Sequence, residues 1–264
     1  GYTVELWAGG SHSLGTADSG SAGTVEVMQA NIDLRLPVGN GLDLKIGQFQ
    51  TVVGAEVDQH NQNAFYTRSR AFSNDQPTHQ TGVLGSYQLS DDASLSVGLV
   101  NDTTSNATNA DSGGTAYLVK LGYTLPDSTG FLGGTELTYA RVDGAGADGS
   151  EQDNQYVGAS VPWPVEGLSY NFAYDLVTYE TGADTTILGH YLSYAATDTM
   201  TVNLRYETGN QNGSVNVDGI QDISVGIDYQ MWENVISRVE YISSDQDGAV
   251  SSSESLVFNL IYIF

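Results

Sequence analysis

The sequence predicts an all-β fold in which about fourteen antiparallel strands follow one another along the chain. Apolar and polar residues alternate over many segments of about ten residues, which is the pattern of strands with one apolar face. The chain of 264 residues has 31 glycines and only 5 prolines, so turns can be frequent while strands stay uninterrupted. Short and long connections also alternate between these segments from one end of the chain to the other.

The alternation is clearest in residues 117–125, 168–176, 200–207 and 223–231, where every second residue is Tyr, Val, Leu, Ile, Phe or Met. The last segment, 254–264, alternates less cleanly because most residues on both of its faces are apolar. All such segments together give fourteen expected strands, at 2–10, 24–36, 41–53, 80–90, 93–102, 114–126, 131–143, 153–163, 167–180, 185–196, 199–209, 219–231, 234–244 and 254–264.

The connections predict how these strands are arranged. The short turns carry the sequences VGN, SDD, PDSTG, PVE, TDT and WEN, and the longer polar connections are 11–23, 54–79, 103–113, 144–152, 181–184, 210–218 and 245–253. Short turns at one end and long loops at the other are typical of an outer-membrane β-barrel with an even number of strands. A soluble β-sandwich would instead use Greek-key connections. We therefore expect a transmembrane antiparallel up-and-down β-barrel forming a single domain over residues 1–264.

Composition agrees with this prediction and excludes other classes. No apolar run reaches the roughly 20 residues of a membrane-spanning helix. The formal net charge of −24 argues against nucleic-acid binding, and the absence of cysteine argues against a disulfide scaffold or thiol catalysis. The 16 Tyr, 7 Phe and 3 Trp argue against disorder. Many of them lie near strand ends, where aromatic belts meet the two membrane surfaces.

The final segment, SESLVFNLIYIF, predicts a location. Its apolar face is expected to contact lipid while the strand closes the barrel. A C-terminal aromatic residue also resembles the signal that delivers outer-membrane proteins to their assembly machinery. We expect a mature chain, without its signal peptide, in the bacterial outer membrane, where lipid and lipopolysaccharide would be its partners.

If the apolar face contacts lipid, the polar face lines the lumen. By parity, that face carries charges of both signs, which are costly in a dry core and favour a water-filled channel. Structural ion pairs that cross a closed barrel are the alternative. The predicted lumen wall comprises Asp33, Arg35, Asp43, Lys45, Lys120, Glu136, Asp175, Arg205, Glu207, Asp228, Arg238 and Glu240.

The longest connection, residues 54–79, combines aromatic and basic residues. Folding into the lumen would bury its three aromatic side chains and narrow the pore. Packing on top of the barrel or against a neighbouring subunit is the alternative. The predicted constriction, where rings of charge set ion selectivity, comprises Glu56, Asp58, Arg68, Arg70 and Asp75.

Residues 44–83 also resemble a known family. The matching positions are Gly47, Phe49, Gly54, Glu56, Tyr66, Arg68, Ser69, Pro77, His79, Gly82 and Val83, followed by SLSVGLVND at 94–102. This pattern resembles the OmpL-like β-barrel porins, over about a fifth of the chain. Arg70 and the extreme acidity depart from it. The resemblance implies a diffusion channel and no catalytic residues.

These observations predict a porin for small hydrophilic solutes and ions, selective for cations because acidic loops surround the mouth. A homotrimer is one expected assembly. The alternative is a closed structural or adhesive barrel, or a sleeve for a partner protein. No enzyme is expected, because the sequence lacks GxSxG, HExxH and phosphate-binding glycine motifs. His12 lies between Ser11 and Ser13, but adjacency in the sequence alone does not make a nucleophile and its base.

No cofactor is expected. Two acidic clusters are weak Ca²⁺ candidates because Ca²⁺ prefers several carboxylate oxygens, although neither has EF-hand spacing. They comprise Asp143, Asp148, Glu151 and Asp153, and Asp245, Asp247 and Glu254. Arg141 falls on the lipid face near the outer rim, where its guanidinium could reach lipid head groups.

Overall fold

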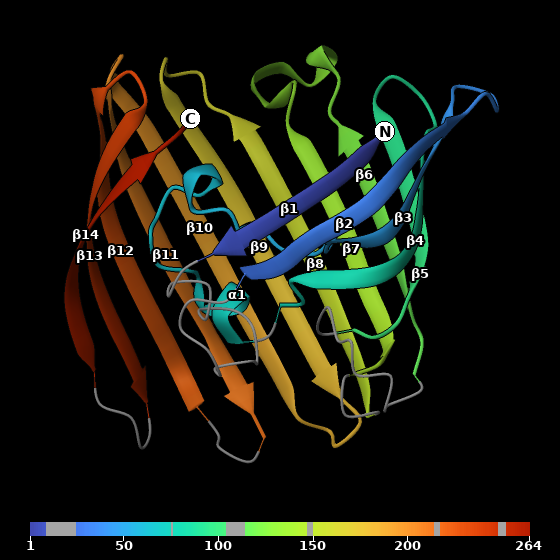
Figure 1. The fold of residues 1–264 in the computed structure, drawn as a ribbon. Coiled ribbons are helices and arrows are strands. Elements are labelled where there is room, and N and C mark those ends of the chain that lie inside the picture. Colours follow the sequence, from blue (N-terminus) through green and yellow to red (C-terminus); the bar gives the residue numbers. More distant parts are fainter. Residues whose placement is uncertain (9–24, 75, 104–113, 147–149, 214–216, 248–251) are drawn as a thin grey trace.

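A computed structural model describes residues 1–8, 25–74, 76–103, 114–146, 150–213, 217–247 and 252–264. These residues form one antiparallel sheet of 14 strands, each paired with its neighbours in the sequence (Figure 1). The strands are β1 Tyr2–Ala8, β2 Val25–Leu36, β3 Leu42–Gln50, β4 His79–Gln88, β5 Ala93–Val100, β6 Ala116–Thr124, β7 Glu136–Ala145, β8 Glu151–Pro162, β9 Leu168–Tyr179, β10 Asp184–Thr197, β11 Met200–Asn212, β12 Val217–Trp232, β13 Val235–Asp247 and β14 Ser253–Tyr262.

The predicted strand number and up-and-down topology are confirmed, and the largest difference in position is at β7. The sequence predicts this strand from residue 131, whereas it begins at Glu136. Residues 127–132 instead form the short 3₁₀ segment η3 (Asp127–Leu132). Gly130 and Gly134 have φ values of 71° and 79°, which glycine adopts without steric cost, so the chain turns here before the strand starts.

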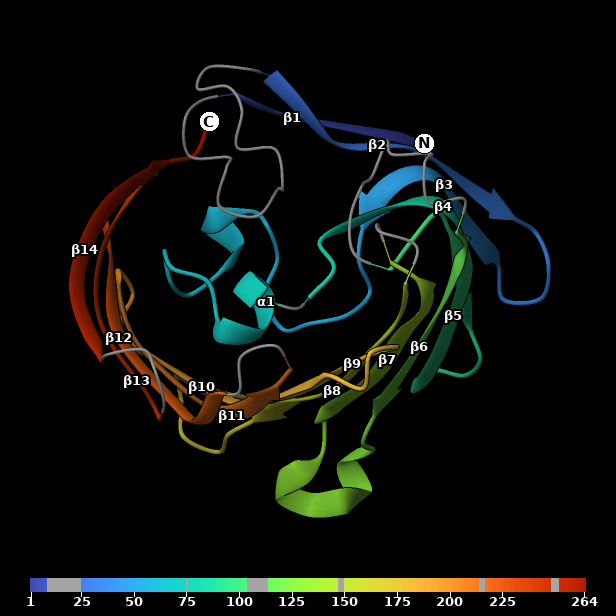
Figure 2. The same cartoon turned by 90° about the horizontal axis from the view of Figure 1, so that it is seen from below.

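The sheet curls around a central space, and Figure 2 shows this along the barrel axis. In the described ranges, the two edge strands β1 and β14 do not pair with each other. Residues 59–61 lie at this seam and line a cavity together with Trp7, Ala8 and residues 261–264. Gln59 Nε2 donates to both carboxylate oxygens of Glu5, at 2.9 and 2.8 Å. These bonds hold the connection between β3 and β4 against β1.

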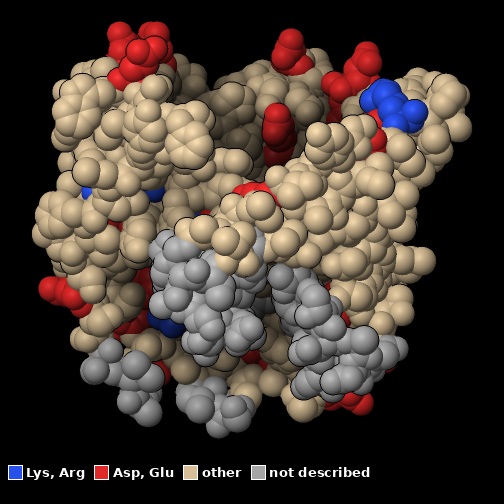
Figure 3. Space-filling model, viewed as in Figure 1, with Lys and Arg blue, Asp and Glu red and all other residues tan. Residues whose placement is uncertain are grey.

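The outer face of the sheet is apolar. On β12, for example, Ile223, Val225 and Ile227 are exposed, while Ser224 between them is buried inside. Exposed rings such as Trp163, Trp232 and Tyr262 lie near the end that carries the short turns. Figure 3 shows a mostly uncharged outer surface, with acidic side chains at that end and others towards the opposite end. Within the described residues, no helix is long and apolar enough to span a bilayer.

The inner face has two unlike halves. On β3–β9, inward side chains form an apolar cluster that comprises Phe49, Leu84, Val100, Ala116, Leu118, Ala140, Val142, Tyr156 and Ala173, together with Val53. On β11–β13, the buried inward residues are mostly charged or polar, and they comprise Asn203, Arg205, Glu207, Asp222, Ser224, Arg238 and Glu240. Buried charges require partners, and these come from the connection between β3 and β4.

Candidate pore constriction

Residues 51–78, which we call the strap, connect β3 to β4 on the concave side of the sheet (Figure 2). The strap contains the 3₁₀ turn η2 (His60–Gln62) and the short helix α1 (Arg70–Asn74). Its two ends are joined by a hydrogen bond from the Thr51 N–H to the Thr78 carbonyl, at 2.9 Å. Val52 and Val53 pack against the apolar cluster of the inner wall. The rest of the strap contacts the opposite, charged half.

Arg205 on β11 is the centre of that contact. Its guanidinium forms an ion pair with Glu56 of the strap, with Nη1 and Oε1 2.9 Å apart, and Nη1 also donates to the Thr67 carbonyl at 3.0 Å. It lies 3.4 Å from Glu207 and 3.7 Å from Glu240. The side chain is only 3% exposed, so these interactions are weakly screened. Arg205 therefore links one strap carboxylate to two wall carboxylates.

Two wall carboxylates bind the strap backbone directly. Glu240 on β13 accepts hydrogen bonds from the Tyr66 and Thr67 N–H groups, both at 3.0 Å, and from the Thr67 hydroxyl. Glu207 accepts from the Arg70 N–H at 2.9 and 3.0 Å. Charge-assisted bonds of this kind are stronger than neutral ones. They hold the strap in one register against β11 and β13.

Further contacts extend the interface along β9–β13. Arg70 forms an ion pair with Asp222 at 2.9 Å. Arg238 donates to the Asn63 carbonyl at 2.9 Å while it is paired with Asp228 at 2.6 Å. Asn203 on β11 donates to the Ala64 carbonyl of the strap at 3.3 Å, and Gln76 of the strap donates to Asp175 on β9 at 2.7 Å.

The structure therefore brings most of the candidate residues together. Glu56, Asp58, Arg68 and Arg70 belong to the strap, while Asp75 lies outside the described residues. The wall residues next to the strap are Asp175, Arg205, Glu207, Asp228, Arg238 and Glu240. A second group lies apart from it, in the ion pairs Arg35–Asp43 (2.9 Å) and Lys45–Asp33 (3.4 Å).

Glu5 on β1, Asp222 on β12 and Asn203 on β11 contact the strap and are absent from the sequence-based set. Asp222 shares the even-numbered parity of Asp228 on β12, so strand alternation contained the signal for it. Asn203 shares the parity of Arg205 on β11 but carries no charge to mark it as a partner of the strap.

Two strap side chains have altered pKa values. Burial lowers the pKa of His60, and the positive charges of Arg68 and Arg238 lower it further. The imidazole stacks on Tyr66, with ring centroids 5.3 Å apart. Burial also lowers the pKa of Arg68, against the opposing charges of Glu56 and Asp58. The His60 ring is therefore neutral at pH 7, and it adds no positive charge to the strap.

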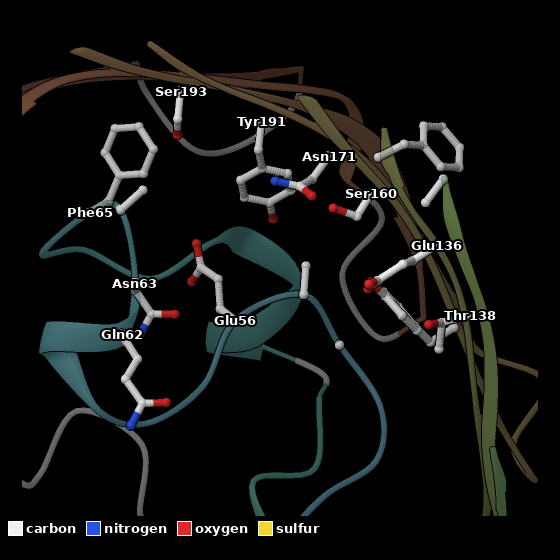
Figure 4. Close-up of a pocket in the computed structure, with 17 residues that line it drawn as sticks. Glu56, Gln62, Asn63, Phe65, Glu136, Thr138, Ser160, Asn171, Tyr191 and Ser193 are labelled. Atoms are coloured by element: carbon white, nitrogen blue, oxygen red, sulfur yellow. The ribbon is translucent and has the colours of Figure 1, made fainter. Parts of the chain in front are cut away.

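A cavity of about 330 Å³ remains between the strap and the wall of β7–β10. Figure 4 shows Glu136, Ser160, Asn171 and Tyr191 projecting from the wall, and Glu56 and Asn63 on the side of the strap. The remaining labelled residues that line it are Gln62, Phe65, Thr138 and Ser193. Apart from Glu136 and Glu56, the cavity is lined by uncharged side chains.

Inward glycines leave room for aromatic rings along the wall. A Cβ atom at Gly158 would lie 2.6 Å from Cζ of Tyr156, and one at Gly189 would lie 2.9 Å from Cε2 of Tyr191. One at Gly226 would lie 3.1 Å from Cε1 of Phe65. The rings of Tyr156 and Tyr191 therefore lie flat along the wall, over glycines whose missing side chains make room for them. Phe65 of the strap lies close over Gly226 in the same way.

We expect Gly158→Ala to lower single-channel conductance, because the added methyl group displaces the Tyr156 ring from the wall towards the cavity. The ring is the far end of a flexible side chain, so the variant should still fold. Planar-bilayer recordings measure the effect. Gly85→Ala is the control, since a Cβ there meets its nearest atom at 3.5 Å, an ordinary contact. Adding Tyr156→Leu to Gly158→Ala should restore the current, and no recovery would contradict this explanation.

The calcium candidates lie elsewhere. Within the described ranges, no group of three or more metal-binding side chains is close enough to hold an ion. Asp143 and Asp153 both pair with Arg141 on the outer face, at 2.9 and 2.7 Å. Asp148 lies outside the described residues. Arg141 thus already binds the two carboxylates that a cation would need.

The chain is similar to known proteins in sequence family and in fold. A family model described as "Putative beta-barrel porin-2, OmpL-like" matches residues 5–259, far more than the segment that carries the resemblance in the sequence. OmpT lacking loop L8, an outer-membrane protein of Vibrio cholerae, has a TM-score of 0.65 at 11% identity, covering 91% of this chain and 81% of that one. The outer-membrane channel DcaP of Acinetobacter baumannii has 0.61 at 12% identity, covering 100% and 98%. No curated protein sequence matches the chain.

Proposed function

The chain belongs to the OmpL-like β-barrel porin family, and from that premise we propose that it conducts ions and small hydrophilic solutes by passive diffusion, with a preference for cations. The protein is an outer-membrane barrel and a porin channel; its selectivity is our proposal. The observation that carries the proposal is the strap, held inside the sheet with a cavity beside it. We propose that the strap and β7–β10 form the constriction of the pore. A closed structural barrel or sleeve is the alternative, which the open cavity disfavours.

Charge along this route supports a preference for cations. Arg70, Arg205 and Arg238 are each paired with carboxylates, so their positive charges are largely neutralised. Among the described residues, Glu136 lines the cavity and forms no ion pair that would offset its charge. The chain as a whole has a net charge of −24, which raises the local concentration of cations at the mouth. Rings of carboxylates are a common basis of cation selectivity.

Replacing Glu136 should weaken that preference. We expect Glu136→Gln to move the reversal potential under a KCl gradient towards zero while conductance stays close to that of the wild type. The matched control is Glu166→Gln, which removes the same charge in the turn between β8 and β9. An equal shift in both variants would mean that overall acidity, and not Glu136, sets the selectivity.

We also propose a homotrimer as the assembly in the membrane. A trimer form of OmpT of V. cholerae has a TM-score of 0.61 to this chain at 12% identity, covering 90% of this chain and 80% of that one, which relates the two by fold. Light scattering of the detergent-solubilised protein measures the protein mass per particle, and a monomer mass would rule the trimer out.

A further inference from the structure

We infer that the cavity beside the strap is a binding site for small uncharged polyhydroxylated solutes of monosaccharide size. The inference rests on the proposed function for the route by which the solute arrives and leaves. The volume of about 330 Å³ lies at the lower end of the roughly 300–1,000 Å³ typical of small-molecule sites. The chemistry of the lining selects the class of solute.

Four uncharged polar side chains of the cavity are free to bind a ligand. The lining residues Thr138, Ser160 and Asn171 on the wall, and Gln62 on the strap, form no side-chain hydrogen bond with other described residues. Two charged groups nearby are not free in this way, because Arg205 and Glu56 already form an ion pair with each other. Hydroxyl and amide groups both donate and accept, which is what the hydroxyl groups of a polyol require. Water can hydrogen-bond to such groups at little cost in entropy until the hydroxyl groups of a solute replace it.

Aromatic rings supply the second component. Tyr191 lines the cavity beside Asn171, and its ring lies over Gly189 along the wall (Figure 4). Phe65 also lines the cavity, but it is 1% exposed and its ring is covered by Arg205, 4.8 Å from the centroid, so it contributes only an edge. The C–H groups on one face of a sugar ring can pack on the Tyr191 ring, while its hydroxyl groups point to the polar side chains. The Tyr191 ring and the free polar groups together favour a polyol over a simple ion.

Charge disfavours anionic sugars. Of the two carboxylates that line the cavity, Glu56 is paired with Arg205 whereas Glu136 forms no ion pair with the described residues, and no lysine or arginine is part of the lining. A sugar acid or sugar phosphate would meet repulsion with no compensating base. An uncharged solute escapes that repulsion and can donate its hydroxyl protons to Glu136. The site therefore discriminates against anions of the same size.

Saturation-transfer NMR on the detergent-folded full chain tests binding apart from conduction. Aromatic protons are irradiated, and the signals of D-glucose, gluconate and tetraethylene glycol are recorded. We expect saturation of D-glucose ring protons, and little for gluconate or for tetraethylene glycol, which has a similar size but few hydroxyl groups. A site built to bind hydroxyl groups rejects analogues that lack them.

Three variants locate the signal. Tyr191→Leu and Asn171→Leu should each reduce glucose saturation several-fold. Ser96→Ala is the control, because its hydroxyl is already bonded to the Ser86 hydroxyl at 2.8 Å, outside the cavity, so its signal should match the wild type. Far-UV circular dichroism of each variant confirms that the barrel is folded, independently of conduction.

Equal saturation of all three solutes, or a glucose signal that survives both leucine variants, would overturn the inference. Conductance without glucose binding would remove the site and leave the channel in place. Glucose binding without conductance would support the site and contradict the proposed diffusion channel. The two proposals can therefore fail separately.

Discussion

Arg205→Ala should lower the free energy of unfolding by about 3–5 kcal/mol, because it leaves buried carboxylates without their partner. Glu56, Glu207 and Glu240 all lie within 3.7 Å of this guanidinium, and the last two are almost completely buried. The strap also loses the hydrogen bond to the Thr67 carbonyl. Urea titration of the protein folded in lipid vesicles measures the change.

The control for this prediction is Arg35→Ala. Arg35 also pairs with a carboxylate at 2.9 Å, but the two side chains are 65% and 53% exposed, so its loss should cost about 0–1 kcal/mol. Similar losses for the two variants would mean that the network around Arg205 is solvated as freely as the exposed pair. The strap would then lack the anchor described above.

Replacing residues 55–74 with a short Gly-Ser linker should raise single-channel conductance several-fold. The linker removes every strap group that faces Arg205, Glu207 and Glu240, and water can solvate these wall charges in the widened lumen. The cavity loses one of its two sides, so selectivity between cations and anions should fall as well. Planar-bilayer recordings give both quantities.

Arg70→Ala is the matched comparison for this replacement. It removes one ion pair, with Asp222, and keeps the strap contacts of Arg205 and Arg238. Mean conductance should therefore remain near that of the wild type. If the linker variant conducts no better than Arg70→Ala, the strap does not limit the current.

Strand periodicity predicted most of the fold because each strand has one face towards lipid and one towards the lumen. Tyr117, Leu121 and Tyr123 on β6 and Ile223, Val225 and Ile227 on β12 were expected outside and are exposed there. The start of β7 was predicted too early, at residue 131, although residues 131–135 (FLGGT) do not alternate between apolar and polar. The turn there depends on the positive φ of Gly130 and Gly134, which the alternation does not encode.

The partners of the strap were harder to predict. Parity places Arg205 and Glu240 on the inner face but cannot say which strap residue each one meets, since these contacts join residues more than a hundred positions apart. Sequence reasoning also treated the lumen wall as uniformly polar. Leu84, Leu118 and Val142 face inward and are buried, because the start of the strap covers this half of the wall.

Single-channel recording tests directly whether the protein is a channel that its strap narrows. Purified, folded protein is inserted into a planar bilayer, and conductance and reversal potential are measured under a KCl gradient. We expect steady conductance with a cation preference, and a larger conductance when residues 55–74 are replaced by the linker. No current from a protein whose folding is verified, with or without the strap, would contradict it and favour a closed structural barrel.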